Sequence, residues 1–319
     1  MRTLLRIVLC SAIAVSAAQA QSPRLVVADQ DAMGPGGSDM RGLMVFLQSP
    51  EVKLLGITTV VGDGWMHEET AHTLRMLELL GRTDVPVHPG AAHPLWRTRE
   101  WTNLASQMWG KAAWEGAWGA SKHAWDEVPN LREGNPTTKA STEDAAHFLV
   151  RMVHEHPNEV TIYGAGPLTN IALAISLDPH FAELARELVI MGGSINPVTE
   201  EKEWTNAPRH EFNFWFDPEA ASITLRAPWK KISITTIDAS IRTRIAPELT
   251  GAMTKSKSAA ARYLDTYISK PVQGVAQFAW DELASAAWLR PRYHHAGTCP
   301  LYRRQHRTRS RLRRHAHLE

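Results

Sequence analysis

Asp29, Asp31 and Asp39 stand close together in the sequence, around a glycine-rich turn at residues 34–37. Residues 25–28, which precede them, are apolar and suit a buried parallel strand, and an apolar helical pattern follows Asp39. The three acids are therefore expected at the carboxyl end of a strand, where open α/β sheets bind ligands. Crowded carboxylates repel one another unless a cation or a shared proton compensates them. Because every donor is an oxygen, a hard divalent cation such as Ca²⁺ or Mg²⁺ is the expected occupant.

The same residues also have a purely structural interpretation. Asp29 could cap the strand, the glycines could form a loop, and Asp39 could cap the following helix. Aspartate-nucleophile phosphatases also begin with a strand and Asp-x-Asp, so a Mg²⁺-dependent phosphohydrolase is one alternative. The sequence has no evident phosphate-binding lysine motif, which leaves that alternative with the least support.

The first twenty residues have the pattern of a secretory signal. Two arginines stand near the start, a mostly apolar stretch follows at residues 7–15, and residues 18–20 form a small-x-small cleavage site. The pattern predicts a secreted or periplasmic protein, and no other stretch is long and apolar enough for a membrane span. Cys10 would leave with the signal, so Cys299 would remain without a partner for an internal disulfide.

The net charge of +2 conceals an uneven distribution along the 319 residues. The signal carries two arginines and no acid, and residues 290–319 carry nine arginines and one acid. The body, residues 21–289, is therefore acidic, with a net charge near −8. An acidic body does not indicate nucleic-acid binding.

Apolar runs and helical spacings alternate through the body, which predicts a single domain with an open, mostly parallel α/β sheet flanked by helices. Expected strands after the first lie at 52–61, 85–87, 160–164, 188–191 and 232–237, and expected helices at 68–80, 142–155, 171–176, 181–186, 218–225, 247–267 and 280–288.

A tryptophan-rich insertion, residues 93–138, interrupts this rhythm and holds six of the chain's twelve tryptophans. Such a segment can be an aromatic subdomain packed on itself. It can also be a lid whose rings stack on a planar ligand group. Composition is compatible with both.

Polar or glycine clusters follow four of the expected strands, which fits a single site at one sheet edge. In this order, the Asp-x-Asp motif, ITTVVGD, GAGPLTNIALAI, LVIMGG, EFNFWFDPEAA and WDELA resemble the nucleoside hydrolase family of the inosine-uridine preferring type. The resemblance covers residues 25–289. It implies a Ca²⁺-dependent enzyme that cleaves the N-glycosidic bond of ribonucleosides, giving ribose and a free base. It also implies a small-molecule nucleoside as partner, and a homo-oligomer.

The resemblance assigns roles to individual residues. Asp31 would bind calcium and take the proton from the attacking water. Asp39, the backbone carbonyl of Ala165 and Asp281 would complete the calcium site. Glu211 and Asn213, with Asn206, would hydrogen-bond the ribose hydroxyls, and Ser38 and Asp63 would line the same substrate site. Asp217 and Glu219, by contrast, are expected to be structural, because they open a helix.

Three positions depart from the family pattern. Ser38 stands where the family has a ribose-binding aspartate, so it can hydrogen-bond the sugar but brings no charge. Asp63 replaces an asparagine and adds negative charge. Trp280 replaces a histidine proposed to protonate the leaving base. These departures support a second hypothesis, a non-catalytic ribose or nucleoside binder of the same fold.

The segment after Leu289 is dense in arginine and has no apolar periodicity. At face value it is a disordered basic arm. We favour a frameshift near residue 290, because a one-base offset can encode peptides such as IITRE and EHGPGYGDTLTW, which look like an ordinary end for this family. The chain would then lack its final native segment, and the DNA sequence of this region tests the idea.

Overall fold

The computed structural model describes residues 22–112, 114–119, 123–200, 210–243, 245, 251, 255–268 and 278–291. The predicted signal at 1–20, the predicted ribose contact Asn206 and residues 292–319 of the tail lie outside the described residues. Within the described ranges, no helix combines the length and apolar character needed to cross a membrane.

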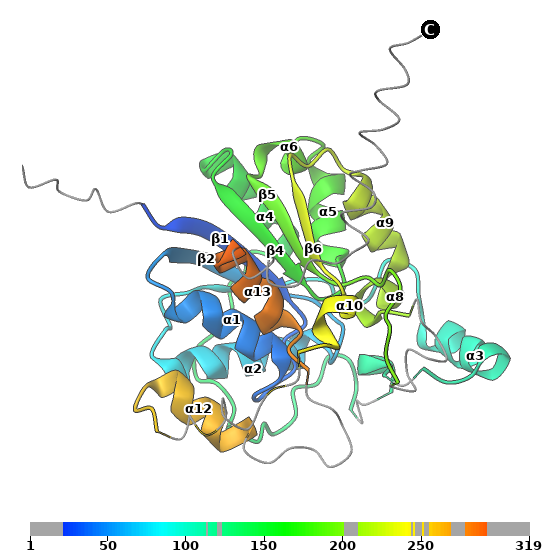
Figure 1. Cartoon of the computed structure of the whole chain (residues 1–319), viewed down its shortest axis with the longest axis horizontal. Coiled ribbons are helices and arrows are strands. Elements are labelled where there is room, and N and C mark those ends of the chain that lie inside the picture. The colour runs from blue at the N-terminus through cyan, green and yellow to red at the C-terminus, as the bar shows by residue number, and fades with distance from the viewer. Residues whose placement is uncertain are drawn as a thin grey trace, which may run out of the picture.

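A six-stranded sheet forms the centre of the molecule, with the strand order β3-β2-β1-β4-β5-β6 (Figure 1). Every neighbouring pair is parallel, which confirms the predicted fold class. The strand order reverses between β1 and β4, because the chain first builds outward to β3 and then returns to the other side of β1. The strands are β1 (Arg24–Gln30), β2 (Val52–Thr59), β3 (Val87–Pro89), β4 (Val160–Ala165), β5 (Glu187–Met191) and β6 (Ile232–Thr235).

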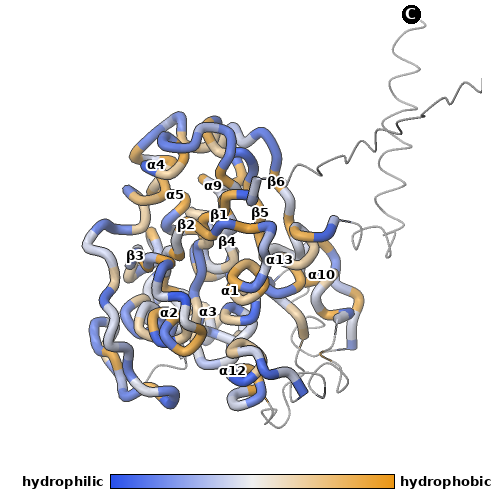
Figure 2. The backbone as a smooth tube through the Cα atoms, turned by 90° about the vertical axis from the view of Figure 1, so that its left-hand side faces the viewer, coloured by the Kyte–Doolittle hydropathy of each residue, from blue (hydrophilic) through white to orange (hydrophobic). Residues whose placement is uncertain are grey.

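Both faces of the sheet are buried, which explains the continuous apolar runs in its strands. Consecutive side chains of a strand point to opposite faces. Val26 and Ala28 of β1 therefore join one core cluster, while Val27 joins the other. In the same way, Tyr163 and Ile162 of β4 pack on opposite faces. Figure 2 shows hydrophobic residues gathered along these central strands.

Two groups of helices cover the two faces (Figure 1). One group is α1 (Ser38–Gln48), α2 (Met66–Leu80), α12 (Ala259–Ile268) and α13 (Asp281–Leu289); the other is α4 (Ala145–Glu155), α5 (Thr169–Leu177), α6 (Phe181–Leu184) and α9 (Pro218–Arg226). The remaining labelled helices are α3 (Arg99–Trp109), the 3₁₀ turn η1 (Gly116–Trp118), α8 (Phe212–Phe216) and α10 (Ile237–Ser240).

Several element boundaries differ from the sequence prediction by a few residues. The strand expected at 25–28 continues through Gln30, so Asp29 is part of β1 rather than a residue beyond it. The helix expected at 142–155 begins at Ala145, because the carboxylate of Asp144 accepts the backbone N–H groups of Ala146 and His147 and caps it. Of the helix expected at 247–267, the structure describes residues 251 and 255–267, and among residues 255–267 the helix α12 begins at Ala259.

The tryptophan-rich insertion is partly packed on the body and partly exposed. Trp118 stacks on Phe216 at a ring-centroid distance of 5.2 Å and meets Trp65 edge-on at 5.6 Å. Helix α3 projects away from the body in Figure 1, and Thr102 is the one buried residue of that helix. The insertion is thus anchored through Trp118 to the loops at the carboxyl edge of the sheet, while Trp109 at the end of α3 is 71% exposed.

Candidate active site

The loops after β1 and β4 meet where the strand order reverses, the usual ligand-binding crevice of open α/β sheets. Gln30 and Ala165, the last residues of the two strands, are paired in register. The following residues, Asp31 and Gly166, are in close contact, since a Cβ atom on Gly166 would lie 2.8 Å from Oδ1 of Asp31. The structure thus brings Asp31 beside the loop of Ala165.

Helices α1 and α13 carry the other two predicted cation ligands, Asp39 and Asp281, to this edge. The two helices approach closely at Gly42, where a Cβ atom would lie 2.7 Å from Cβ of Asp281. Gln30 Nε2 donates to Oδ1 of Asp39 at 3.2 Å, which connects α1 to β1. The side chain of Ser38 hydrogen-bonds the carboxyl group of Asp281, so this predicted sugar contact joins α1 to α13.

Neither aspartate caps its helix. The N-cap of α1 is Gly37 and that of α13 is Trp280. Asp39 and Asp281 lie inside their helices and are 5% and 3% exposed, respectively. The capping interpretation of Asp39 is therefore wrong, and both carboxylates are buried in the first turns of their helices, beside the acids that follow β1.

Four buried or half-buried carboxyl groups at this edge have raised pKa values, and repulsion within the group contributes to three of these shifts. Burial and then repulsion from Asp63, Glu69 and Asp281 hold the pKa of Asp31 well above its ordinary value. Burial and then repulsion from Asp281, Asp63 and Asp31 do the same for the pKa of Asp39. The acids predicted to share one ion are thus close enough for their charges to repel.

The other two pKa shifts have the same main cause. Burial raises the pKa of Asp281 to about 7, opposed by the Ser38 hydrogen bond and helped by repulsion from Glu282 and Asp63. Burial also raises the pKa of Asp63 to about 6, opposed by a hydrogen bond from Trp114 and helped by repulsion from Glu211. Asp63 is therefore close to both the predicted cation ligands and the predicted sugar contacts.

The charge and the donor atoms of this cluster fit a hard divalent cation. The guanidinium of Arg41 on α1 is held in a salt bridge with Glu282 at 2.5 Å. Neither it nor any other positive group is among the causes of the pKa shifts of Asp31, Asp39 and Asp281. The described residues contain no group of three or more His, Cys, Asp or Glu side chains gathered tightly enough to hold a metal ion. The oxygen donors are of the type that a hard divalent cation prefers, and the carboxylates would have to move closer together to coordinate one.

Asp29 has a different role from its neighbours. It is fully buried, and its Oδ1 accepts hydrogen bonds from Thr58 Oγ1 at 2.5 Å and Asn170 Nδ2 at 2.7 Å. Asn170 also donates to the carbonyl of Thr59 at 3.0 Å and accepts the N–H of Ala91 at 2.8 Å. This network ties β1, β2 and α5 together beneath the site, and burial raises the pKa of Asp29 to about 7.

The predicted ribose contacts lie at the start of α8. Glu211 is the N-cap of this helix, accepting the N–H groups of Asn213 at 3.0 Å and Phe214 at 2.9 Å. It also accepts the N–H of Gly193, whose φ of +75° suits the turn after β5. Asn213 Nδ2 donates to the carbonyl of Met191 at 3.1 Å. These contacts fix both side chains firmly, and burial raises the pKa of Glu211.

Asp217 and Glu219 were predicted to be structural, and the contacts of Asp217 agree. It is the N-cap of α9, accepting the N–H of Ala220 at 3.1 Å, and it also binds Thr169 Oγ1 at 2.7 Å and the N–H of Leu95 at 2.9 Å.

Sequence reasoning missed two residues of the site, Glu69 and Trp114. Glu69 is fully buried in α2, and its Oε1 accepts the N–H of Gly64 at 2.7 Å. Trp114 Nε1 donates to Oδ1 of Asp63 at 2.5 Å. An acid such as Glu69 in the first turn of a helix commonly stabilises the helix itself. A tryptophan such as Trp114 in an aromatic segment commonly packs against other rings. Neither residue therefore indicated a site in the sequence.

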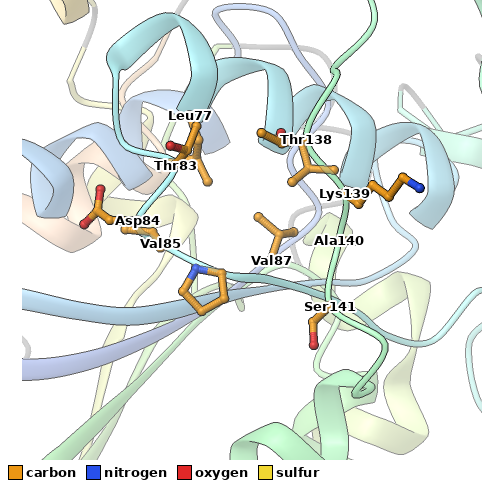
Figure 3. Close-up of a pocket in the computed structure, with 11 residues that line it drawn as sticks. Leu77, Thr83, Asp84, Val85, Val87, Thr138, Lys139, Ala140 and Ser141 are labelled. Carbon is orange, nitrogen blue, oxygen red and sulfur yellow. The ribbon is translucent and has the colours of Figure 1, made fainter.

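A separate cavity of about 280 Å³ lies beside the first residue of β3, away from the carboxyl end of that strand (Figure 3). Its walls come from the end of α2, the residues before β3 and the segment 138–141, and include Leu77, Val85 and Ser141. None of the predicted site residues lines it, so it is distinct from the carboxylate cluster.

Comparisons with known proteins agree with the fold and the motifs. A model of the family described as inosine-uridine preferring nucleoside hydrolase matches residues 26–315, which includes much of the arginine-rich tail. The probable uridine nucleosidase 1 of Oryza sativa subsp. japonica is 33% identical over 189 residues, 59% of this chain and 52% of that protein. The pyrimidine-specific ribonucleoside hydrolase RihA of Enterobacter sp. (strain 638) is 34% identical over 193 residues, 60% of this chain and 54% of that protein. The chain thus spans about half the length of these curated relatives.

Solved structures share the architecture. A plant nucleoside hydrolase, the PpNRh1 enzyme, superposes with a TM-score of 0.62 at 25% identity, covering 84% of this chain and 79% of that one. A purine-preferring ribonucleoside hydrolase from Gardnerella vaginalis superposes with a TM-score of 0.63 at 24% identity, covering 84% and 80%.

Proposed function

The chain belongs to the inosine-uridine preferring nucleoside hydrolase family, and we propose that it hydrolyses the N-glycosidic bond of ribonucleosides in a Ca²⁺-dependent reaction, releasing ribose and a free base. The observation that carries the proposal is the group of buried acids at the switch point of the sheet. Asp31 and Asp39 come from one stretch of the chain, and Asp63 and Asp281 from two others. Repulsion nevertheless connects all four carboxylates.

Asp31 is the proposed general base. The N–H of Asp63 donates to its Oδ2 at 3.1 Å, which fixes the orientation of the carboxylate. A carboxylate held in this way can accept the proton of a water that attacks the anomeric carbon. Its raised pKa brings it closer to the pH at which a base is effective, because proton transfer is most efficient when the pKa lies near the working pH.

Asp31, Asp39, Asp281 and the carbonyl of Ala165 are the proposed calcium ligands. When bound, Ca²⁺ would supply Lewis-acid polarisation of the oxygens of water and sugar. The carboxylates themselves stabilise the positive charge that develops on the ribosyl ring during bond cleavage.

The proposed ribose contacts are Glu211 and Asn213, with Ser38, Asp63 and Asn206. Side chains placed to hydrogen-bond sugar hydroxyls discriminate strongly against analogues that lack them. Glu211 and Asn213 are held by backbone contacts, so they offer fixed hydrogen-bonding groups to a sugar. Trp280 cannot donate the proton that a histidine would, so we expect the highest rates on substrates with good leaving groups.

The decisive experiment measures product release from a panel of purine and pyrimidine ribonucleosides and 4-nitrophenyl β-ribofuranoside, with Ca²⁺ and with a chelator. Release of ribose and base that the chelator abolishes and Ca²⁺ restores supports the proposal. Saturable heat in calorimetry without any product would instead indicate the non-catalytic binder. Release of phosphate from phosphate esters with Mg²⁺ would indicate a phosphohydrolase.

We also propose that the protein is exported and that it is a homo-oligomer. Export is supported by the pattern of residues 1–20. N-terminal sequencing of the protein recovered outside the cytoplasm should begin at Gln21, and light scattering should give a multiple of the chain mass. A protein that retains Met1, or a strictly monomeric mass, would contradict these two statements.

A further inference from the structure

Residues 62–64, called here the 62–64 loop, fix the position of the proposed general base. The N–H of Asp63 donates to Oδ2 of Asp31 at 3.1 Å. Gly62 packs directly on the same carboxylate, since a Cβ atom there would lie 2.2 Å from Oδ2 of Asp31. From the side of α2, Glu69 Oε1 holds the loop through the N–H of Gly64 at 2.7 Å. A shift of this loop would therefore move or reorient Asp31.

The tryptophan-rich insertion holds the loop from the other side. Trp114 Nε1 donates to Oδ1 of Asp63 at 2.5 Å, and the N–H of Ala117 donates to the carbonyl of Gly62 at 2.9 Å. The insertion fits tightly here, because a Cβ atom on Gly116 would lie 2.2 Å from that same carbonyl oxygen. Trp118, buried against Trp65 and Phe216, anchors this part of the insertion to the body.

We propose that Trp114 is a positioning residue for catalysis, which acts on Asp31 through Asp63. This inference rests on the proposed function. The indole N–H holds the side chain of Asp63, and the backbone N–H of Asp63 holds the carboxylate of Asp31. The insertion is then a working part of the site, rather than an aromatic subdomain independent of it.

The geometry explains why an indole is suitable. Asp63 lies among carboxylates, including Asp31 and Glu211, that repel its own charged side chain. A short hydrogen bond from a neutral donor keeps the side chain of Asp63 in place against that repulsion and adds no further charge to the cluster. Phenylalanine at position 114 would keep the ring and lose this donor.

The test compares W114F with W109F, a matched control. Trp109 lies in the same insertion, is 71% exposed and has a ring contact with Trp101 rather than with the loop. With the full chain and the substrate hydrolysed best by the wild type, W114F should lower kcat/KM about tenfold, as expected for the loss of one hydrogen bond to a charged group. W109F should remain within about twofold of the wild type.

A double-mutant cycle then asks whether Trp114 acts through Asp63. In a D63A background, W114F should change kcat/KM by less than about twofold, because the bond it removes is already absent. Losses that multiply independently, or a W114F protein indistinguishable from W109F, would overturn the inference.

A measurement independent of catalysis follows the hydrogen bond itself. In a ¹H–¹⁵N spectrum, the indole resonance that disappears in W114F should move upfield in D63A, while the resonance lost in W109F should stay unchanged. An unmoved Trp114 resonance overturns the inference even where D63A has no measurable activity. A wild-type protein that binds no substrate and releases no product defeats the proposed function, and the inference with it. An active wild type with an insensitive W114F defeats the inference alone.

Discussion

In the absence of divalent cations, the free energy of unfolding of this protein should fall as the pH rises from about 4 to about 7. The reason is the buried acid cluster, and Asp281 gives the clearest case, because its pKa rises from 3.8 to about 7 on folding. Between these two values the folded state binds more protons than the unfolded state. The contribution of Asp281 to the free energy of unfolding is therefore fully present below the pKa of the unfolded state, and it is lost as the pH rises through the pKa of the folded state.

The size of the effect follows from the same pKa shift. One pKa unit corresponds to about 1.4 kcal/mol, so the shift of Asp281 corresponds to about 4 kcal/mol across that pH range. A cation that binds the ionised cluster should offset much of the loss. At a free concentration about 100 times its Kd, it would add about 2.7 kcal/mol, which is about 5–10 °C in Tm for a domain of this size.

The assay is urea unfolding at several pH values between 4 and 8, with chelator, Ca²⁺ or Mg²⁺, followed by far-UV circular dichroism. D281N should flatten the pH dependence and weaken the response to the cation. D126N is the matched control, because Asp126 is exposed and lies in the insertion, outside the cluster. If the free energy of unfolding of the chelated protein is the same at pH 7.5 as at pH 5, or if neither cation raises it, the cluster does not hold uncompensated charge and the prediction is refuted.

Three further substitutions test other parts of the site. D31N should lower kcat at least about 100-fold, because an amide cannot accept the proton of water; retained activity in steady-state assays would exclude Asp31 as the base. G42A should weaken cation binding in calorimetry and cost about 1–3 kcal/mol, since its methyl group would lie 2.7 Å from Cβ of Asp281; unchanged affinity would show that this close approach is unimportant. N170A should cost about 1–3 kcal/mol in urea unfolding because it removes a hydrogen bond from buried Asp29, and a neutral result would show that the network beneath the site is dispensable.

Local sequence patterns predicted the sheet and one half of the site. The apolar run before Asp29 predicted a buried parallel strand, and parallel strands place the residues that follow them at one edge. The strand pattern therefore placed Asp31 and the segment 164–170 at one edge, and the structure pairs Gln30 with Ala165 there. Pattern was less successful at helix ends, as with α4, because several neighbouring polar residues could serve equally well as the cap.

The family motifs identified the acids, and distant contacts decided what each acid does. Asp29 and Asp31 are two residues apart, yet Asp29 belongs to a buried network with Asn170, while Asp31 meets Asp63 and lies within the field of Asp281. Local spacing gives the position of each acid on or after the strand, but the residues that each acid contacts come from other segments of the chain. The partners of both acids therefore depend on how those segments pack.

The sequence by itself determined the alternation of strands and helices, the acidic body and the positions of carboxylates after strands, because these depend on residue type and short-range spacing. Only the tertiary structure decided that α13 would bring Asp281 against Gly42, and that Trp114 would cross 51 positions of sequence to reach Asp63. Such contacts arise from the packing of whole elements, and the free energy that selects them is spread over the core rather than encoded near either residue.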